Sequence, residues 1–336
     1  MECTFADICS GIGGFSIGAK RHGNAIYGLD INAETIPLWL ANSGAQPNTG
    51  RIGDMNLKEN WPKARPFMHI HASAPCTALS VANNTGLGKI EGAEQYRLSL
   101  ERCIEGNFHS FSNEQVATPV TKAIAEEFVK KYPGRCDSMV VRMQDLGLAS
   151  DRTRLIVSTP EIIADLKCEP CIRTSIRACF EAQNLALPPL AAFIKLSRGR
   201  HKTPALRSVD TTACTIVASG PGVWCEKGPE FKTIRVLHPS ESAALNGFGP
   251  EGAFKLPLRQ RDAQLGVGNA IPPLVASIIM RSAVKNMTAT QMVVNAEHAE
   301  HSELQPAHSC LEDRSRLREE LDHLINAAKR IRGMVG

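Results

Sequence analysis

The first half of the chain alternates between short apolar stretches and longer amphipathic ones. Apolar runs bounded by turn residues predict strands at CTFADIC, AIYGLD, PFMHIHAS and HSFSNEQV, which span residues 3–9, 25–30, 66–73 and 109–116. Helical spacing predicts helices at 15–23, 33–42 and 120–132, and a further pair of strands is predicted at 138–146 and 153–160. Strands that alternate with helices are typical of a parallel sheet covered on both faces, so the pattern predicts an α/β fold.

The second half is less regular. Residues 161–230 hold several cysteines, many prolines and glycines, and the basic run KLSRGRHK, which together predict a small irregular region. A helix-and-turn pattern returns over 231–285. The stretch 286–310 is polar and poor in large apolar residues, so it predicts a linker.

The last segment, 311–336, predicts an amphipathic helix. Its apolar positions share one face, at Leu317, Leu321, Leu324, Ala328 and Ile331. Such a face either packs back on the body of the protein or binds a partner helix, a second copy of the chain included. The pattern leaves both open.

Size and charge set broad limits on function. The 336 residues are enough for one large or two modest domains with a substantial core, and 43% of them are hydrophobic. The net charge of +4 permits an anionic partner without requiring one.

The cysteines and the N-terminus bear on location. The 11 cysteines are irregularly spaced, and MECTFADICSG lacks the features of a signal peptide. No apolar run is long enough for a membrane span. We expect a reducing location: the cytoplasm of a bacterium or virus-infected cell, or the nucleus of a eukaryote. CEPC at 168–171 is one CxxC pair, and Cys179 and Cys225 are poorly spaced to complete a zinc site, so no metal is expected.

A glycine-rich turn, DICSGIGGFSIG, joins the first predicted strand to the first predicted helix. Its glycines let a ligand approach the backbone closely, although a plain tight turn needs the same residues. The second strand ends in Asp30, where a carboxylate can bind the hydroxyls of a ribose. The turn lacks the full dinucleotide spacing, which favours S-adenosylmethionine over a nicotinamide cofactor. Asp54, after another predicted strand, either reaches an adenine amino group or caps a helix.

The stretch SAPCTALS places Cys76 just after a predicted strand, between a proline and small polar residues. A structural cysteine usually lies among large apolar residues, whereas a cysteine in a loop at a strand end can be a nucleophile. This stretch alone does not decide between the two.

The order of motifs over residues 4–282 resembles the cytosine-C5 methyltransferases of the DNA-modifying family. DICSGIGGF and GLDIN are similar to its first two motifs, SAPCTALS to its proline-cysteine motif, and NEQV to its Glu-Asn-Val motif. DLGLASDRTRLIV resembles its Gln-x-Arg-x-Arg segment, and its late motifs resemble RSVDTTACTIV, IRVLHPSESAALNGFG and QLGVGNAIPP. One such motif is weak, but the whole set in the family's order is specific.

The resemblance implies a Rossmann-like class I S-adenosylmethionine-dependent methyltransferase fold with a small irregular recognition domain. It assigns 1–160 and 231–285 to the catalytic and cofactor-binding domain and 161–230 to target recognition. The cofactor it implies is S-adenosylmethionine. The residues implied to bind it are Asp7, Cys9, Gly11, Ile12, Gly13, Gly14, Phe15, Asp30, Ile31, Asp54, Met55, Pro75, Asn269 and Ala270.

The resemblance also implies methylation of cytosine in double-stranded DNA through a covalent adduct. A thiolate added at carbon 6 of the ring makes carbon 5 electron-rich. Cys76 supplies this thiolate, helped by a depressed pKa or a nearby cation, and Glu114 hydrogen-bonds ring nitrogen 3. Arg152 and Arg154, alternate residues of one strand, hold the pyrimidine carbonyl and steady the acid and the thiolate.

The target carbon is stacked inside duplex DNA, so enzymes of this kind flip the base into a pocket. The polar stretch 77–96 predicts either a mobile lid over that base, with Ser80 on a phosphate, or a plain surface loop. The basic residues expected to neutralise phosphates are Lys195, Arg198, Arg200 and Lys202.

Three positions depart from the family's pattern. Cys9 replaces a phenylalanine that helps hold the cofactor, Gln115 replaces the asparagine of Glu-Asn-Val, and Ser150 replaces the glutamine of the Arg-x-Arg segment. These changes leave room for weaker cofactor affinity, an altered cofactor or an inactive member.

Other interpretations stay open. A branch of the same family methylates cytosine in transfer RNA, although its Cys-Phe-Thr signature is missing from this chain. A non-catalytic DNA-binding relative would explain the three departures but not the retention of Cys76 and Glu114. A nicotinamide oxidoreductase would explain the glycine turn and Asp30 but none of the later motifs.

Overall fold

The computed structural model describes residues 3–80, 88–196, 205–218, 220, 222–228, 230–250 and 252–302. The chain divides into two compact units, residues 1–288 and 289–336. The strands and the cavity described below belong to the first unit.

A seven-stranded sheet forms the centre of the first unit, in the order β3-β2-β1-β4-β5-β7-β6. Its pairs are parallel except those made by β7, which runs antiparallel to both β5 and β6. The strands are β1 Thr4–Ile8, β2 Asn24–Asp30, β3 Gly50–Ile52, β4 Met68–Ala72, β5 Ser110–Val116, β6 Asp137–Arg142 and β7 Thr153–Ser158. The predicted α/β fold is confirmed, with one reversed strand.

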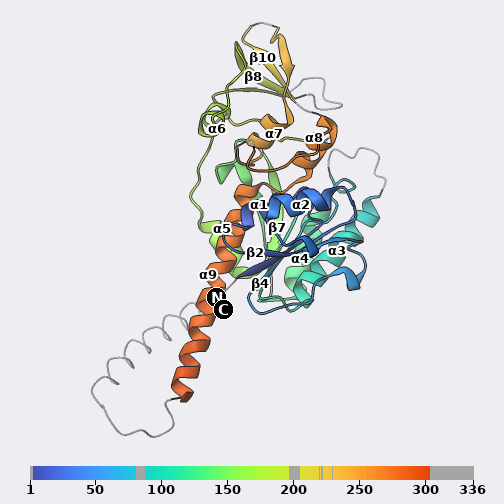
Figure 1. The fold of residues 1–336 in the computed structure, drawn as a ribbon, viewed down its shortest axis with the longest axis vertical. Coiled ribbons are helices and arrows are strands. Elements are labelled where there is room, and N and C mark those ends of the chain that lie inside the picture. Colours follow the sequence, from blue (N-terminus) through green and yellow to red (C-terminus); the bar gives the residue numbers. More distant parts are fainter. Residues whose placement is uncertain are drawn as a thin grey trace, which may run out of the picture. The chain divides into compact units, whose positions relative to one another are not determined.

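Helices cover both faces of this sheet (Figure 1). One face packs in a buried cluster with α1 Gly14–Ala19, α2 Thr35–Ser43, α5 Pro160–Cys168 and the start of α9 Pro273–Ser302. The other face packs with α3 Lys89–Glu105 and α4 Pro119–Lys131. The sheet is therefore buried on both sides, as parallel sheets generally are.

Alternate side chains of β4 lie on opposite faces of the main sheet and match the environment of each face. Met68 and Ile70 join the cluster under α3 and α4. His69 and His71 lie on the α1 side, where the ring of Phe15 stacks on them with centroid distances of 5.9 and 3.9 Å. Successive side chains of a strand point to opposite faces, so the alternation of apolar residues and histidines matches the two environments.

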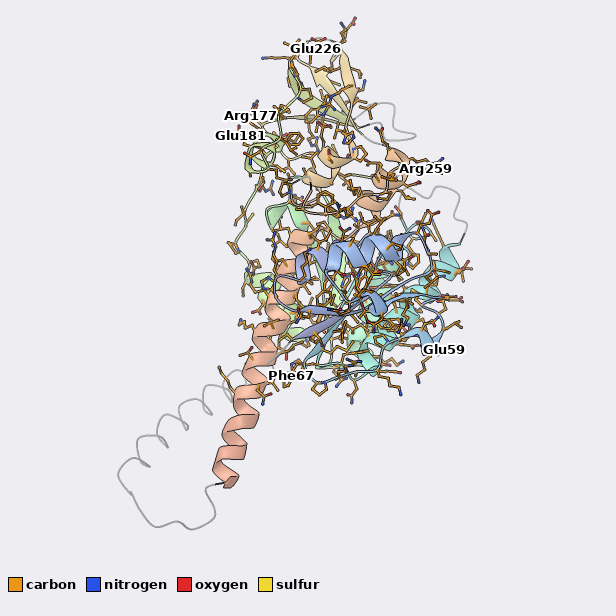
Figure 2. All side chains as sticks on the ribbon, in the orientation of Figure 1. Glu59, Phe67, Arg177, Glu181, Glu226 and Arg259 are labelled. Atoms are coloured by element: carbon orange, nitrogen blue, oxygen red, sulfur yellow. The ribbon has the colours of Figure 1, made fainter. Side chains whose placement is uncertain are left out.

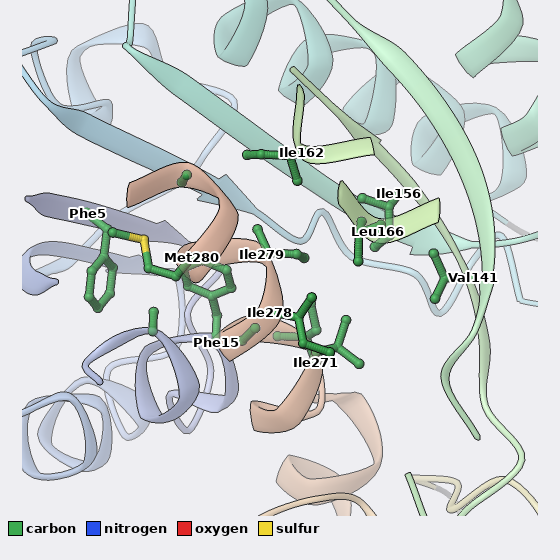
Figure 3. Packing of buried hydrophobic residues seen from close by; sticks show 14 of the residues in the cluster. Phe5, Phe15, Val141, Ile156, Ile162, Leu166, Ile271, Ile278, Ile279 and Met280 are labelled. Carbon is green, nitrogen blue, oxygen red and sulfur yellow. The ribbon is translucent and has the colours of Figure 1, made fainter. Parts of the chain in front are cut away.

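The start of α9 is a core helix. The stretch Gln260–Met292 is long and apolar enough to cross a membrane by length and composition, but 67% of its most apolar window is buried inside the protein. Figure 3 shows Met280 of this helix beside Phe5 of β1 and Phe15 of α1. Packing against the sheet accounts for its apolar character.

A second sheet has four antiparallel strands in the order β11-β10-β8-β9. They are β8 Ala191–Leu196, β9 Ala205–Ser208, β10 Val223–Glu226 and β11 Thr233–Val236. Three short helices share an apolar cluster with this sheet: α6 Ile176–Ala182, α7 Pro239–Leu245 and α8 Gln260–Asn269. The sheet lies largely within the predicted recognition domain, 161–230, although α5 packs against the main sheet and β11 lies beyond residue 230.

Two local expectations differ from the structure. Residues 89–96, expected in a mobile lid or a plain surface loop, form the first turns of α3, which starts after Gly88. Residues 286–302, expected in a linker, continue α9. Alanine, methionine, glutamine and glutamate form helices well without a large apolar face, so a polar composition does not exclude a helix. Residues 81–87 of the predicted lid and the predicted helix at 311–336 lie outside the described residues.

Candidate active site

A cavity of about 880 Å³ opens at the carboxyl ends of β1, β2, β4 and β5. Ligands of open α/β sheets bind at this edge. The predicted site residues that line it are Asp7, Cys9, Gly11, Ile12, Gly14, Phe15, Asp30, Pro75, Cys76, Glu114, Asn269 and Ala270. The fold thus brings the glycine turn, the proline-cysteine motif, the predicted acid and the final motif into one place.

The glycines of the turn have different roles. A Cβ on Gly11, where φ is +51°, would meet nothing within 4 Å, so this backbone borders open space. A Cβ on Gly14 would lie 2.5 Å from the carbonyl oxygen of Ile271. Gly14 therefore lets α1 pack against the returning chain, whereas Gly11 leaves room for a ligand.

Asp30 links the end of β2 to the glycine turn. Its Oδ2 accepts a hydrogen bond of 2.8 Å from the backbone N–H of Gly11, and its Oδ1 accepts one of 2.9 Å from Asn32. A carboxylate has about four acceptor sites. Asp30 can therefore hold the turn and still accept hydrogen bonds from a ligand in the cavity.

Four residues predicted to bind the cofactor do not line the cavity. Gly13 instead provides the left-handed N-cap of α1, and Ile31 is 71% exposed on the surface. Met55 is buried, with its Sδ 3.2 Å from the Sγ of Cys9. Asp54 accepts a hydrogen bond from the backbone of Asn56 and closes a turn. A role for these four toward the cofactor stays a prediction.

Cys76 opens a tight turn in the loop that follows β4. Its carbonyl accepts hydrogen bonds from the backbone of Leu79 at 3.1 Å and Ser80 at 2.9 Å. On the other side of the cysteine, Nε2 of Gln115 donates a 3.1 Å hydrogen bond to the carbonyl of Ala74. The glutamine that departs from the family's asparagine thus holds the loop that carries the cysteine.

The surroundings of Cys76 favour the thiol over the thiolate. Burial raises the pKa of Cys76, and the charge of Glu114 raises it further, while Arg154 and Arg152 oppose this. The expected depressed pKa is therefore not found. Because the nearby carboxylate works against the thiolate, activation depends on removing or neutralising that negative charge.

Glu114, which lines the cavity, forms an ion pair with Arg154, which does not line it. The Nε of Arg154 lies 2.8 Å from Oε1 of Glu114, and the two side chains are 12% and 6% exposed. Oε1 has no well-directed hydrogen bond among the described residues. The acid is thus held by charge, with acceptor capacity left for a molecule in the cavity.

Arg152 lies elsewhere than the sequence predicts. It donates hydrogen bonds to the carbonyl oxygens of Gly268 at 3.0 Å and Ala270 at 2.9 Å, and it does not line the cavity. Burial lowers the pKa of this guanidinium to about 9, helped by the charge of Arg154. Arg152 is a positioning residue in this structure, because it fixes the end of α8, where Asn269 and Ala270 reach the cavity.

Residues 255–259 also line the cavity, although no sequence motif pointed to them. The side chain of Asn42 clamps this segment in place. Its Nδ2 donates to the carbonyls of Ile12 at 2.7 Å and Lys255 at 3.0 Å, and its Oδ1 accepts from the backbone N–H of Lys255 at 2.6 Å. No motif marks Asn42, because its partners come from distant parts of the chain.

The residues predicted to bind nucleic acid are only partly described. Lys195 lies on β8 opposite Val223 of β10, and Ser80 ends the described stretch after Cys76. Arg198, Arg200 and Lys202 lie outside the described residues. Figure 2 shows charges of both signs around the small sheet, with Arg177 and Glu181 on α6, Glu226 on β10 and Arg259 before α8.

The two cysteines of CEPC, Cys168 and Cys171, are exposed, whereas Cys179 and Cys225 are buried. Within the described ranges, no group of three or more histidine, cysteine, aspartate or glutamate side chains is arranged to hold a metal ion.

Sequence comparison identifies a family over the N-terminal part of the chain. Residues 3–105 match the family model described as C-5 cytosine-specific DNA methylase. No curated protein matches the chain. Over residues 3–105 the family resemblance drawn from the motifs is confirmed, and the methyl donor of that family is S-adenosylmethionine.

Solved structures share the fold. A prophage-encoded protein assigned as a DNA modification methyltransferase (E. coli) has a TM-score of 0.59 at 16% identity, covering 85% of this chain and 99% of its own. The Entamoeba histolytica methyltransferase EhMeth has a TM-score of 0.57 at 16% identity, with coverages of 85% and 99%. The S. pombe Dnmt2 methyltransferase has a TM-score of 0.57 at 13% identity, with coverages of 84% and 99%. At these identities the likeness shows the fold, which is the Rossmann-like methyltransferase fold that the motifs imply.

Proposed function

We propose that this chain methylates carbon 5 of cytosine in double-stranded DNA, with S-adenosylmethionine as donor and Cys76 as nucleophile. The match of residues 3–105 to the C-5 cytosine-specific DNA methylase model supports this proposal. One observation carries the proposal. Cys76 and Glu114 line the same cavity as the open backbone of Gly11 and the carboxylate of Asp30. Neither the glycine turn nor the cysteine motif alone would distinguish this chemistry from a plain turn or a structural thiol.

The residues around the glycine turn fit S-adenosylmethionine. Asp30 can accept hydrogen bonds from ribose hydroxyls, and the space beside Gly11 admits a ligand against the backbone. The buried Oγ of Ser10 also lines the cavity and has no hydrogen-bond partner among the described residues. Phe15 and Leu38 supply apolar surface. The bound cofactor supplies the electrophilic methyl group that carbon 5 receives.

The charges in the site indicate the order of the proton transfers that accompany the attack of Cys76 on carbon 6. Glu114 opposes the thiolate of Cys76, so transfer of the thiol proton to Glu114 removes the negative charge that holds the pKa of Cys76 up. The protonated acid then donates its proton to ring nitrogen 3 while the sulfur bonds to carbon 6. The proton lost by sulfur is gained by nitrogen, and carbon 5 becomes an enamine carbon that accepts the methyl group.

The reverse transfers release the product. Carbon 5 loses its hydrogen as a proton, the bond from sulfur to carbon 6 breaks, and the proton on nitrogen 3 returns through Glu114 to the thiolate of Cys76. Arg154, 2.8 Å from Glu114, stabilises the carboxylate that re-forms.

Duplex DNA is the proposed substrate, and its target base must leave the stack to reach the cavity. The basic residues on and around β8, led by Lys195, are proposed to contact phosphates. Affinity for DNA should therefore fall with rising salt, and an affinity insensitive to salt would contradict this role.

The direct test uses labelled S-adenosylmethionine with unmethylated mixed-sequence DNA, and with total transfer RNA in parallel. The wild-type protein should place label in DNA as 5-methylcytosine, and Cys76→Ser should not. Label confined to transfer RNA would move the proposal to the RNA branch of the family. DNA binding without label in either substrate would favour a non-catalytic relative.

A further inference from the structure

Five polar side chains form a continuous hydrogen-bonded chain on the α1 side of β4 and β5. Nδ1 and Nε2 of His69 contact the hydroxyls of Ser110 at 2.8 Å and Ser112 at 2.9 Å. Nδ1 and Nε2 of His71 contact the hydroxyls of Ser112 and Ser73, each at 2.8 Å. Ser112 joins the two halves, so the order is Ser110–His69–Ser112–His71–Ser73.

Strand register builds this chain. His69 pairs with Ser110 and His71 with Ser112 across the parallel β4–β5 pair, so all four side chains share one face. Both histidines and Ser112 have no solvent exposure, and Phe15 stacks on the imidazoles. Bulk water is therefore excluded from the middle of the chain.

Burial keeps both imidazoles neutral. It lowers the pKa of His69 to about 3, with a contribution from the charge of His109, and it lowers the pKa of His71 well below its ordinary value. A neutral imidazole donates from one ring nitrogen and accepts at the other, and a serine hydroxyl can do both. Such groups in a row can pass a proton along without any of them staying charged.

The two ends of the chain lie in different places. Ser73 lines the cavity that holds Cys76 and Glu114. Ser110, the first residue of β5, retains 4% exposure and follows the half-buried His109. The chain thus runs from the active-site cavity along the sheet to the amino-terminal end of β5.

We propose that this chain is a proton relay that carries the proton released from carbon 5 of cytosine out of the cavity to solvent. The relay rests on the proposed function, because that reaction is the source of the proton. None of its members is needed to form the bond from Cys76 to carbon 6, so the relay acts only on the last step.

Before the reaction, each hydroxyl and imidazole of the chain donates its hydrogen bond to the neighbour on the Ser110 side, and with this orientation the proton transfers balance. Ser73 takes the proton from carbon 5 on its oxygen and passes its own to Nε2 of His71, whose Nδ1 proton moves to Ser112. Ser112 passes its own proton to Nε2 of His69, whose Nδ1 proton moves to Ser110, and Ser110 releases one to a solvent water. The electron pair of the carbon–hydrogen bond restores the ring double bond as sulfur leaves.

The test separates adduct formation from proton loss. DNA with 5-fluorocytosine traps the covalent, methylated adduct, because fluorine cannot leave as a cation. DNA with tritium at carbon 5 reports proton release. Ser112→Ala interrupts the relay, and we expect it to trap adduct as fast as wild type while tritium release falls by roughly 100-fold. Ser112→Thr retains the hydroxyl and should restore release.

A control variant and two further measurements distinguish a proton relay from a purely structural role. Ser242→Ala removes another fully buried hydroxyl, on α7, which has no hydrogen-bond partner among the described residues, and should change neither rate. The slow release by Ser112→Ala should also lose the multi-proton solvent isotope effect expected of wild type. Nitrogen-15 NMR should show His69 and His71 neutral through the ordinary titration range of histidine.

Three outcomes would overturn the relay. The first is unchanged tritium release by Ser112→Ala. The second is an equal loss of adduct trapping and tritium release in that variant, which would mean a purely structural role. The third is a charged His69 or His71. If wild type itself traps no adduct, the proposed function fails and the relay has no proton to carry. If wild type and Ser112→Ala both trap adduct and release tritium at the same rates, the relay alone fails and the proposed function stands.

Discussion

Arg154 and Glu114 are diagonal neighbours on the antiparallel β5–β7 pair, where Arg154 lies opposite Val116, and their Nε and Oε1 atoms are 2.8 Å apart. Both side chains are almost buried, so neither charge is well solvated without the other. The position of the proposed acid in the cavity therefore depends on a residue of the one reversed strand.

Removal of that cation should cost both stability and activity. Arg154→Met keeps the aliphatic length but leaves the carboxylate unpaired, so we expect a loss of about 3–5 kcal/mol in the free energy of unfolding. Methyl transfer should fall as well, and Arg154→Lys should recover part of both. Urea unfolding and label transfer measure this. A Met variant as stable and active as wild type would show that the pair is incidental.

Replacement of Glu114 should make Cys76 easier to alkylate, although it abolishes methyl transfer. Burial and the carboxylate raise the pKa of Cys76, so alkylation by iodoacetamide should need a higher pH than an ordinary thiol. Glu114→Gln should lower that pH while it abolishes methyl transfer. Mass spectrometry of the Cys76 peptide follows the reaction, with Cys76→Ser as the control for assignment. An unchanged or higher midpoint in Glu114→Gln would contradict the proposed coupling.

Two glycines of the same turn should give different phenotypes. Gly14→Ala places a Cβ about 2.5 Å from the carbonyl oxygen of Ile271, so the packing of α1 must shift and thermal stability should fall. Gly11→Ala meets no atom within 4 Å, and its left-handed backbone costs only roughly 1–2 kcal/mol. Gly11→Ala should therefore stay folded but bind S-adenosylmethionine more weakly. Equilibrium dialysis measures the affinity for S-adenosylmethionine, and thermal unfolding measures stability. If Gly11→Ala and wild type bind S-adenosylmethionine equally well, the cofactor does not lie against the backbone of Gly11.

Asp7 should make stability fall as pH rises. Burial raises its pKa from 3.8 to about 7, despite hydrogen bonds from Ser16 and Trp39. Between these two values the folded protein holds a proton that the unfolded chain has lost, so this contribution is present in full below pH 3.8 and is lost as pH rises through about 7. Asp7→Asn removes the dependence.

The buried histidines act in the opposite direction at acidic pH, because their lowered pKa values make protonation favour the unfolded chain. The useful quantity is therefore the difference in unfolding free energy between Asp7→Asn and wild type. This difference should move in favour of the variant as pH rises from about 4 to 7. A difference independent of pH would mean that Asp7 titrates at its ordinary value.

Local pattern and motif order were enough to predict much of this protein. Apolar periodicity located β1, β2, β4, β5 and α4, because burial on one or both faces leaves its mark within each segment. The motifs also predicted that Cys76, Glu114 and Asp30 belong to one site. Parallel strands bring their carboxyl ends to one edge of a sheet, so residues after different strands meet there.

Tertiary structure decided which partner each polar side chain finds. Arg152 and Arg154 are alternate residues in the sequence, yet one binds carbonyls at the end of α8 and the other pairs with Glu114. Asn42 holds Lys255 across 213 positions of the chain. The hydrogen-bonded chain through His69 and His71 exists only because the β4–β5 register sets serines opposite histidines. Periodicity and turn chemistry act over a few residues, whereas these contacts follow from register and from the way distant helices pack, and no short stretch of sequence records them.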